Sequence, residues 1–268
     1  MALSDEIREE RKKLKGKGPK AYWEYFWEYY KLPAFGIIFG IFFVVSMTKT
    51  ILTSKDTGFG AIFINPAMTD YAMYDDSLAA LAEDYAAFAG IDTKEYNINL
   101  DLSEYLTLGF PGGEQDYAVL MKITTQTAAH EVDVMVADAF YFWYYARNSM
   151  FLDLREVYTE EELAALPGEL YYMDAAENRE RLQAYEEDPS YMEDFPTTEE
   201  AAAFENPDTF VLPDPSGMRE PVPYGIVVTD APFIEKEGFY PGAVSIYGVV
   251  AGSERLEAAK SFLSYMYR

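Results

Sequence analysis

Apolar residues are distributed along the chain in two different ways, and the first is a long uninterrupted run. Residues 33–48 contain no charged side chain, and if Lys49 snorkels to the surface the run continues through Ile51 and Leu52. Its length is close to the roughly 20 residues that a helix needs to cross a bilayer. The pattern therefore predicts one transmembrane helix over residues 32–52.

Beyond residue 58, short apolar runs alternate with segments of helical periodicity. Runs at 60–65, 96–102 and 132–137 are typical of strands, and each is followed by apolar residues at helical spacing. Later strand-like runs and a final helix follow beyond residue 223. This alternation favours a parallel sheet with helices on its faces. The predicted fold class is α/β, with a mostly parallel sheet and flanking helices, preceded by one transmembrane helix.

The segment 158–223 differs from the rest of the domain. Its first part is acidic and is predicted to be helical in pieces, and five prolines between residues 206 and 223 interrupt any regular element. We interpret 158–223 as an insertion or a reduced second lobe. The predicted organisation is a basic tail with an interfacial aromatic helix over 1–31, a transmembrane helix over 32–52, a linker over 53–58 and an α/β domain over 59–268.

Charge is unevenly distributed on the two sides of the predicted membrane helix. Residues 1–32 carry eight of the 21 Lys and Arg residues and six of the 46 Asp and Glu residues, so the remainder is strongly acidic. The positive-inside rule places the tail in the cytoplasm and the domain outside the cell, in a single-pass protein of the cell membrane. A cleaved signal peptide fits less well, because the apolar run is long and no A-x-A-like site follows it closely.

Aromatic residues crowd the segment just before the membrane helix. They are expected at the level of the lipid head groups, where they anchor the chain in the bilayer or dock onto the membrane helices of a partner. The predicted interfacial residues are Trp23, Trp27, Tyr30 and Lys31. Gly36 and Gly40 form a G-x-x-x-G pattern that packs against another membrane helix or reflects only the tolerance of such helices for small residues.

Composition excludes several classes of function. The net charge of −25 repels phosphate backbones, so no nucleic-acid partner is expected. The absence of cysteine removes disulfides, thiolate metal sites and thiol nucleophiles. His130 is the only histidine, and no P-loop, G-x-S-x-G or H-E-x-x-H pattern occurs. We therefore expect no enzyme, with an unrecognised hydrolase as the alternative, and no metal or cofactor.

Four segments occur in an order that is typical of one protein family. Residues 133–140 are a strand that ends in an Asp-containing turn, and 150–159 follow it; residues 244–253 are a late strand, and 257–265 are an Ala-rich helix with a Phe-Leu pair. In this order they resemble extracellular solute-binding proteins of the type 2 periplasmic-binding fold. The resemblance covers part of the domain and implies one lobe of that fold with a shortened second lobe.

Candidate binding residues follow from the positions at which the predicted strands end. Asn65 and Asp138 close two strands, and ligands of open α/β sheets bind beyond the carboxyl ends of strands. Tyr141 and Tyr145 lie one helical turn apart after Asp138, and Tyr247 lies in the late strand. Tyrosines stack on sugars or peptides and donate hydrogen bonds. The alternative is that these aromatic rings belong to the core.

These observations predict a membrane-anchored, extracytoplasmic, solute-binding-like domain that acts by binding, with a small molecule of the sugar or peptide class as ligand. The alternative is a non-enzymatic scaffold subunit that uses a degenerate binding fold to hold a membrane-protein partner. An open site around Asp138 favours the first hypothesis. A filled site with an exposed apolar patch favours the second.

Overall fold

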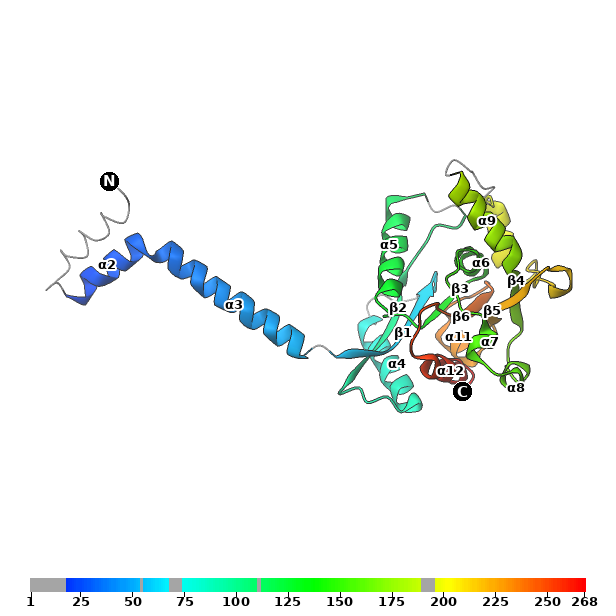
Figure 1. Ribbon diagram of the computed structural model, residues 1–268. Helices are drawn as coiled ribbons and strands as arrows, with labels where there is room; N and C mark the ends of the chain where they lie inside the picture. Colours follow the sequence, from blue (N-terminus) through cyan, green and yellow to red (C-terminus); the bar gives the residue numbers. More distant parts are fainter. Residues whose placement is uncertain (1–17, 54, 68–73, 110–111, 189–195) are drawn as a thin grey trace. The chain divides into compact units, whose positions relative to one another are not determined.

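The computed structural model describes the chain except for residues 1–17, 54, 68–73, 110–111 and 189–195. It divides into two units, Met1–Ser54 and Lys55–Arg268 (Figure 1). The described part of the first unit holds two helices, and the second unit is an α/β domain with a six-stranded sheet.

The helices described in the first unit are α2 (Pro19–Tyr29) and α3 (Lys31–Thr53). On α2 the rings of Trp23 and Trp27 stack with centroids 6.1 Å apart, and Tyr30 caps the carboxyl end of the helix. Lys31 begins α3, and the first 20 residues of this helix form a segment that is long and apolar enough to cross a membrane. Gly36 and Gly40 lie within α3 and have no atom near the position of a Cβ.

The sheet of the domain is mixed, which corrects the prediction of a mostly parallel sheet. The strand order is β2-β1-β3-β6-β5-β4. The strands are β1 (Asp56–Ile64), β2 (Tyr96–Glu104), β3 (Val134–Asp138), β4 (Leu170–Asp174), β5 (Pro221–Val227) and β6 (Ser245–Val249). β1 is parallel to β2 and β3, whereas the pairs β3–β6, β6–β5 and β5–β4 are antiparallel. Runs of buried apolar residues show that a strand exists but not its direction, so the prediction was wrong in the second half of the chain.

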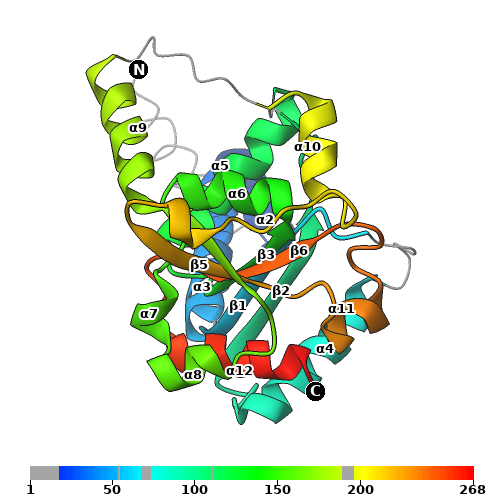
Figure 2. The ribbon, with the colours of Figure 1, turned by 90° about the vertical axis from the view of Figure 1, so that its right-hand side faces the viewer.

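Helices cover both faces of this sheet. The longer helices are α4 (Tyr74–Ala89), α5 (Glu114–Ala128), α6 (Ala139–Arg147), α9 (Ala175–Glu187), α10 (Thr198–Glu205) and α12 (Leu256–Met266). The short ones are α7 (Leu154–Val157), α8 (Glu160–Ala164), α11 (Pro232–Glu237) and the 3-10 turn η2 (Pro215–Gly217). Figure 2 shows α5, α6 and α10 on one face and α4, α7, α8, α11 and α12 on the other.

Alternation along the strands creates two cores, one on each face. Phe59, Ala61 and Phe63 of β1 point to the face covered by α4 and α12, and Ile62 and Ile64 point to the face covered by α5 and α6. All five side chains are buried. The result is a three-layer α/β/α arrangement.

Glycines let α6 approach the sheet closely. The rings of Phe142 on α6 and Phe151 after it are stacked, with centroids 4.4 Å apart and planes within 9° of parallel. A Cβ on Gly248 of β6 would lie 2.7 Å from Phe151 and 2.8 Å from Phe142, which is too close for carbon atoms. The two rings therefore rest on bare backbone, and this fixes the height of α6 above the sheet.

Two boundaries differ from the sequence prediction. β1 begins at Asp56, so residues 56–58, predicted as linker, are the first of a strand. β5 begins at Pro221 and also contains Pro223, because prolines are tolerated at the start of a strand, where the ladder is not yet regular. The described residues of 158–223 include α8, β4, α9, α10, η2 and the first residues of β5, and β4 pairs with β5 as the last strand of the sheet.

Candidate functional site

The structure brings Asn65 and Asp138 together at the carboxyl ends of β1 and β3. The Asn65 side-chain amide donates to Asp138 Oδ2 at 2.8 Å, and Asn65 Oδ1 accepts from the backbone N–H of Leu106 at 2.7 Å. Asn65 adopts a positive φ of 55°, a left-handed conformation that asparagine tolerates better than most residues. The pair therefore ties the ends of two neighbouring strands to the loop after β2.

Asp138 also begins α6. Its Oδ1 accepts a hydrogen bond from the backbone N–H of Tyr141 at 2.7 Å, which is the usual role of an aspartate at a helix N-cap. Its side chain is nevertheless buried, with 2% of its surface exposed. Burial raises the pKa of this carboxyl, although the hydrogen bonds from Tyr141 and Asn65 favour its ionised form.

A second carboxyl, which the sequence did not single out, lies against the first. Glu205 ends α10, and its carboxyl group is hydrogen-bonded to that of Asp138. Burial and the neighbouring charge raise the pKa of Glu205 to about 8. Two carboxylates close together repel each other, which adds to the effect of burial. Glu205 stands in a long acidic stretch, and nothing in its local sequence distinguishes it from its neighbours.

The three predicted tyrosines lie in the core. Tyr141, Tyr145 and Tyr247 are at most 4% exposed. Tyr141 donates to the carbonyl oxygen of Thr107, and Tyr247 donates to that of Ala259 at 2.7 Å. In this conformation none of them contributes to an open surface beside Asp138.

α10 covers the carboxyl ends of β1 and β3. Ala201 of this helix is fully buried against α6, and the carbonyl oxygen of Glu205 accepts from the backbone N–H of Val244 at 2.8 Å. The place where an open sheet normally binds its ligand is therefore filled by the protein's own chain.

A groove opens next to this closed edge, on the outer side of α6 (the α6 groove). Its volume is about 630 Å³, compared with about 450 Å³ for a second hollow of the domain. Residues that line it include Trp143 and Arg147 of α6, Tyr171 of β4, Arg181 of α9, Phe204 of α10 and Met218 after η2. The guanidinium of Arg147 lies 4.3 Å from the centre of the Trp143 ring, and that ring also packs against Phe204. The groove thus combines aromatic and apolar side chains with two arginines and with three acids of its α9 wall, Asp174, Glu177 and Glu180.

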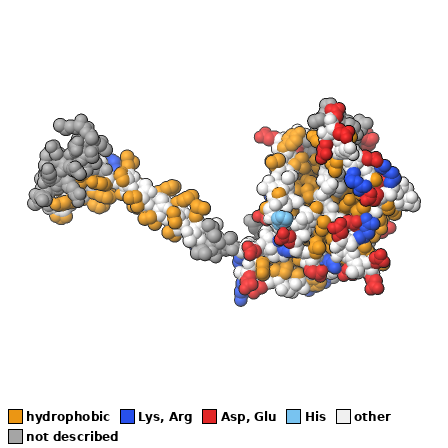
Figure 3. Space-filling view, viewed as in Figure 1, with side chains coloured by type: hydrophobic (Ala, Val, Ile, Leu, Met, Phe, Trp, Pro, Cys, Tyr) orange, Lys and Arg blue, Asp and Glu red, His pale blue; other side chains and the backbone are white. Residues whose placement is uncertain are grey.

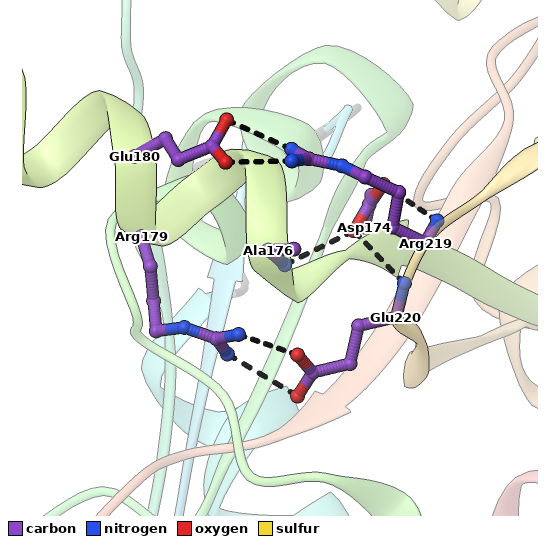
Figure 4. Close-up of polar contacts among 6 residues, drawn as sticks. All are labelled: Asp174, Ala176, Arg179, Glu180, Arg219 and Glu220. Atoms are coloured by element: carbon purple, nitrogen blue, oxygen red, sulfur yellow. Dashed lines mark hydrogen bonds and ion pairs between the residues drawn. The ribbon is translucent and has the colours of Figure 1, made fainter.

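Ion pairs fix the α9 wall of the groove. Figure 4 shows Arg219 bridging to Glu180, at 2.6 and 2.9 Å, and Arg179 bridging to Glu220. Asp174 begins α9 and accepts the backbone N–H groups of Arg219 and Glu220, at 2.9 and 3.1 Å, and these bonds lower its pKa. The residues that lead into β5 and the first turns of α9 are therefore held together.

A buried charge cluster lies at the opposite ends of the same strands. Asp133 is fully buried and accepts hydrogen bonds from Gly60 N at 2.9 Å, Ser253 Oγ at 2.6 Å and Arg255 Nε at 2.8 Å. Arg255 also donates to the carbonyl oxygen of His130. Every polar atom of the carboxylate is engaged by the protein's own groups, which is typical of a structural role.

The described residues contain no group of three or more His, Cys, Asp or Glu side chains placed to hold a metal ion. No protein-family model, no curated protein and no solved structure matches the chain. The resemblance to solute-binding proteins therefore stays a prediction.

Proposed function

We propose that the chain is a single-pass membrane protein whose acidic α/β domain lies outside the cytoplasm and acts by binding a small ligand in the α6 groove. The observation that carries this proposal is the groove itself, with its volume of about 630 Å³ and its aromatic lining. Binding sites for small molecules are usually concave, mostly apolar, and hold a few polar groups that fix orientation, with volumes of about 300–1,000 Å³.

Two different parts of the chain form the walls of the groove. One wall is α6, which follows directly from the sheet, and the others come from segment 158–223, interpreted above as a reduced second lobe. A ligand held between these parts would contact both the sheet core and the insertion. The residues that would contact the ligand then differ from those predicted from the sequence: they are Trp143 and Phe204, and not the buried tyrosines.

The test is a thermal-shift screen of the full chain in detergent micelles against sugars, amino acids, short peptides and divalent cations. A ligand that binds only the native state raises Tm in proportion to the logarithm of its concentration. Phe204→Ala removes a groove side chain and should abolish the shift, whereas Tyr117→Ala, on the exposed face of α5, should retain it. A shift that survives Phe204→Ala would place the ligand elsewhere, and the absence of any shift in a cooperatively melting protein would refute the proposal.

Two observations favour the scaffold hypothesis by the criterion given in the sequence analysis: α10 fills the site at Asp138, and one apolar surface is exposed. Tyr117 and Met121 on α5 are 54% and 66% exposed, and Figure 3 shows hydrophobic side chains gathered over this helix. Thr124 and Thr125 on the same helix donate their hydroxyls back to Leu120 and Met121 carbonyl oxygens, both at 2.8 Å. This uncharged face is unusual in so acidic a domain, and exposed apolar patches often mark protein contacts.

A photo-crosslinking residue at position 121 distinguishes the two functions. If the chain is a scaffold, it should crosslink in intact membranes to one defined membrane protein, and the same residue at exposed position 185, on α9, should not. If neither position crosslinks and a ligand stabilises the protein, ligand binding is the function that the experiments support.

A further inference from the structure

We propose that the outer edge of β2 is a docking site for an extended segment of another protein, which adds a strand to the sheet and directs cationic side chains towards α5. The site is separate from the α6 groove, which is lined by β4 at the other end of the strand order. In strand addition, main-chain hydrogen bonds supply affinity and pockets for alternate side chains supply specificity.

The edge of β2 is open to a further strand. β2 is the last strand on its side of the sheet, and in the part of the chain that the structure describes no strand pairs with its outer edge. Edge strands are usually protected by short length, proline or lysine, because their outward N–H and C=O groups can pair with another chain. β2 has nine residues and contains neither proline nor lysine, whereas β4, at the opposite edge, has only five residues.

A hollow of about 450 Å³ surrounds this edge. Its lining includes Leu78, Ala79 and Ala82 of α4, residues 98–101 of β2, and Gln126 near the end of α5. α4 and α5 cover opposite faces of the sheet (Figure 2). Because β1 and β2 are paired along this stretch, a hollow that touches both helices must pass around the outer edge of β2. The two helices therefore form walls on either side of the edge.

The two walls receive different side chains. Ile98 and Leu100 of β2 pack on the side of α4, where the wall consists of small apolar residues. Asp101 points to the other side, where Lys122 of α5 binds it at 2.7 Å. Successive side chains of a strand point to opposite faces of a sheet. An added strand would therefore place every second side chain against α4 and the others against α5.

The α5 wall presents acceptors and negative charge. The side-chain oxygen of Gln126 is buried, and none of the described residues donates a hydrogen bond to it, which is costly for a buried acceptor. Asp101 and Glu131 line the same hollow. Lys122 is shared between Asp101 and Glu104, so these three acids outnumber the lysine that serves them. A donor that is also a cation would satisfy both the amide oxygen and the excess charge.

The occupant that fits both walls is a protein segment in which small apolar residues alternate with lysine or arginine. The apolar residues would lie on α4, and the cations would lie on α5. A second copy of this chain fits less well. Its β2 would bring another Asp101 and Glu104 to the same acids, and like charges on paired strands are destabilising.

The test uses the full chain in detergent micelles and the fluorescently labelled peptide Lys-Val-Lys-Val-Lys-Val-Lys, with binding followed by fluorescence anisotropy. One control peptide has every backbone nitrogen methylated, so it keeps the charge but cannot donate main-chain hydrogen bonds. A second control has glutamate in place of lysine. The lysine peptide should bind saturably, and both controls should bind at least about tenfold more weakly.

A matched pair of variants locates the binding site. Ala79→Arg places a bulky cation in the α4 wall of the hollow and should weaken binding of the lysine peptide at least about tenfold. Ala80→Arg makes the same change at the next residue, which does not line the hollow, and its affinity should stay within about twofold of the wild type. Both alanines are exposed on α4, so neither variant should lose the fold.

The proposal would be overturned if the lysine peptide showed no saturable binding up to about 1 mM. It would also be overturned if either control peptide bound as tightly as the lysine peptide, since backbone pairing or charge would then not be required. Equal effects of Ala79→Arg and Ala80→Arg would place the peptide outside the hollow. Finally, a full chain that sediments as a dimer and becomes monomeric only in Ala79→Arg would show that a second copy occupies the edge.

Discussion

The buried carboxylate of Asp133 offers the sharpest test of how this domain is held together. It is fully buried and joins β1, β3 and the start of α12 through Gly60, Ser253 and Arg255. In Asp133→Ala, the backbone N–H of Gly60 loses its acceptor in a buried place. The guanidinium of Arg255 loses its anion but keeps some access to water, since 21% of its side chain is exposed.

The magnitude follows from these two losses. An unsatisfied buried donor costs about 1–3 kcal/mol, and breaking a buried ion pair costs about 3–5 kcal/mol when the remaining charge is fully enclosed. Because Arg255 is partly solvated, we expect the lower part of this range, a loss of about 3 kcal/mol in the free energy of unfolding. Glu257→Ala removes an acid that is 90% exposed and should change stability by no more than about 0.5 kcal/mol.

The assay is urea unfolding of the full chain in detergent micelles, followed by near-ultraviolet circular dichroism of the buried tyrosines. The midpoint should fall in Asp133→Ala with little change in the m-value, since the surface exposed on unfolding is nearly the same. A loss below about 1 kcal/mol, or a loss equal to that of Glu257→Ala, would contradict the view that this cluster holds the strands together.

Three further predictions concern other parts of the molecule. Gly248→Ala should destabilise the domain by about 1–3 kcal/mol in the same assay, because the new methyl group meets the stacked rings of Phe142 and Phe151. Asp116→Asn should reduce the loss of stability as pH falls. The pKa of Asp116 is lowered in the folded protein, so the carboxylate stabilises the fold at pH values above its usual pKa of 3.8. This stabilisation disappears as pH falls through the folded-state pKa, and the Asn variant lacks it at every pH. Because the chain has no cysteine, single cysteines report membrane sidedness cleanly. In intact cells, a membrane-impermeant maleimide should label Val211→Cys, which is 81% exposed in the wild type, and not Ser4→Cys, and the reverse pattern would invert the proposed orientation.

The sequence predicted some features well because local patterns determine them. Asn65 and Asp138 were expected to close two strands, and the structure joins their side chains at 2.8 Å. The strand-like pattern of residues 96–102 likewise corresponds to β2. Both inferences use only the spacing of apolar residues along the chain and the residue at which an apolar run ends.

Other features were not predictable from local pattern. β4 has only five residues, within a segment that reads as acidic helix, and its antiparallel pairing with β5 depends on contacts between distant parts of the chain. The contact of Glu205 with Asp138 is of the same kind, since many acids in that stretch have equivalent surroundings in the sequence. Aromatic residues after Asp138 fit a binding surface and a core equally well until the packing of α6 and α10 is known.

The position of β6 determines when the domain can fold. This strand comes from residues near the end of the chain, yet it lies between β3 and β5 in the interior of the sheet. Until it has been synthesised, β3 and β5 have no partner on that side, and the two halves of the sheet cannot join. Pairings between such distant residues form slowly, because a long loop must close before any contact is gained. A ribosome must therefore have synthesised the chain through β6 before the sheet can be completed, long after α3 has emerged, and a chain cut short before β6 should never reach the native state.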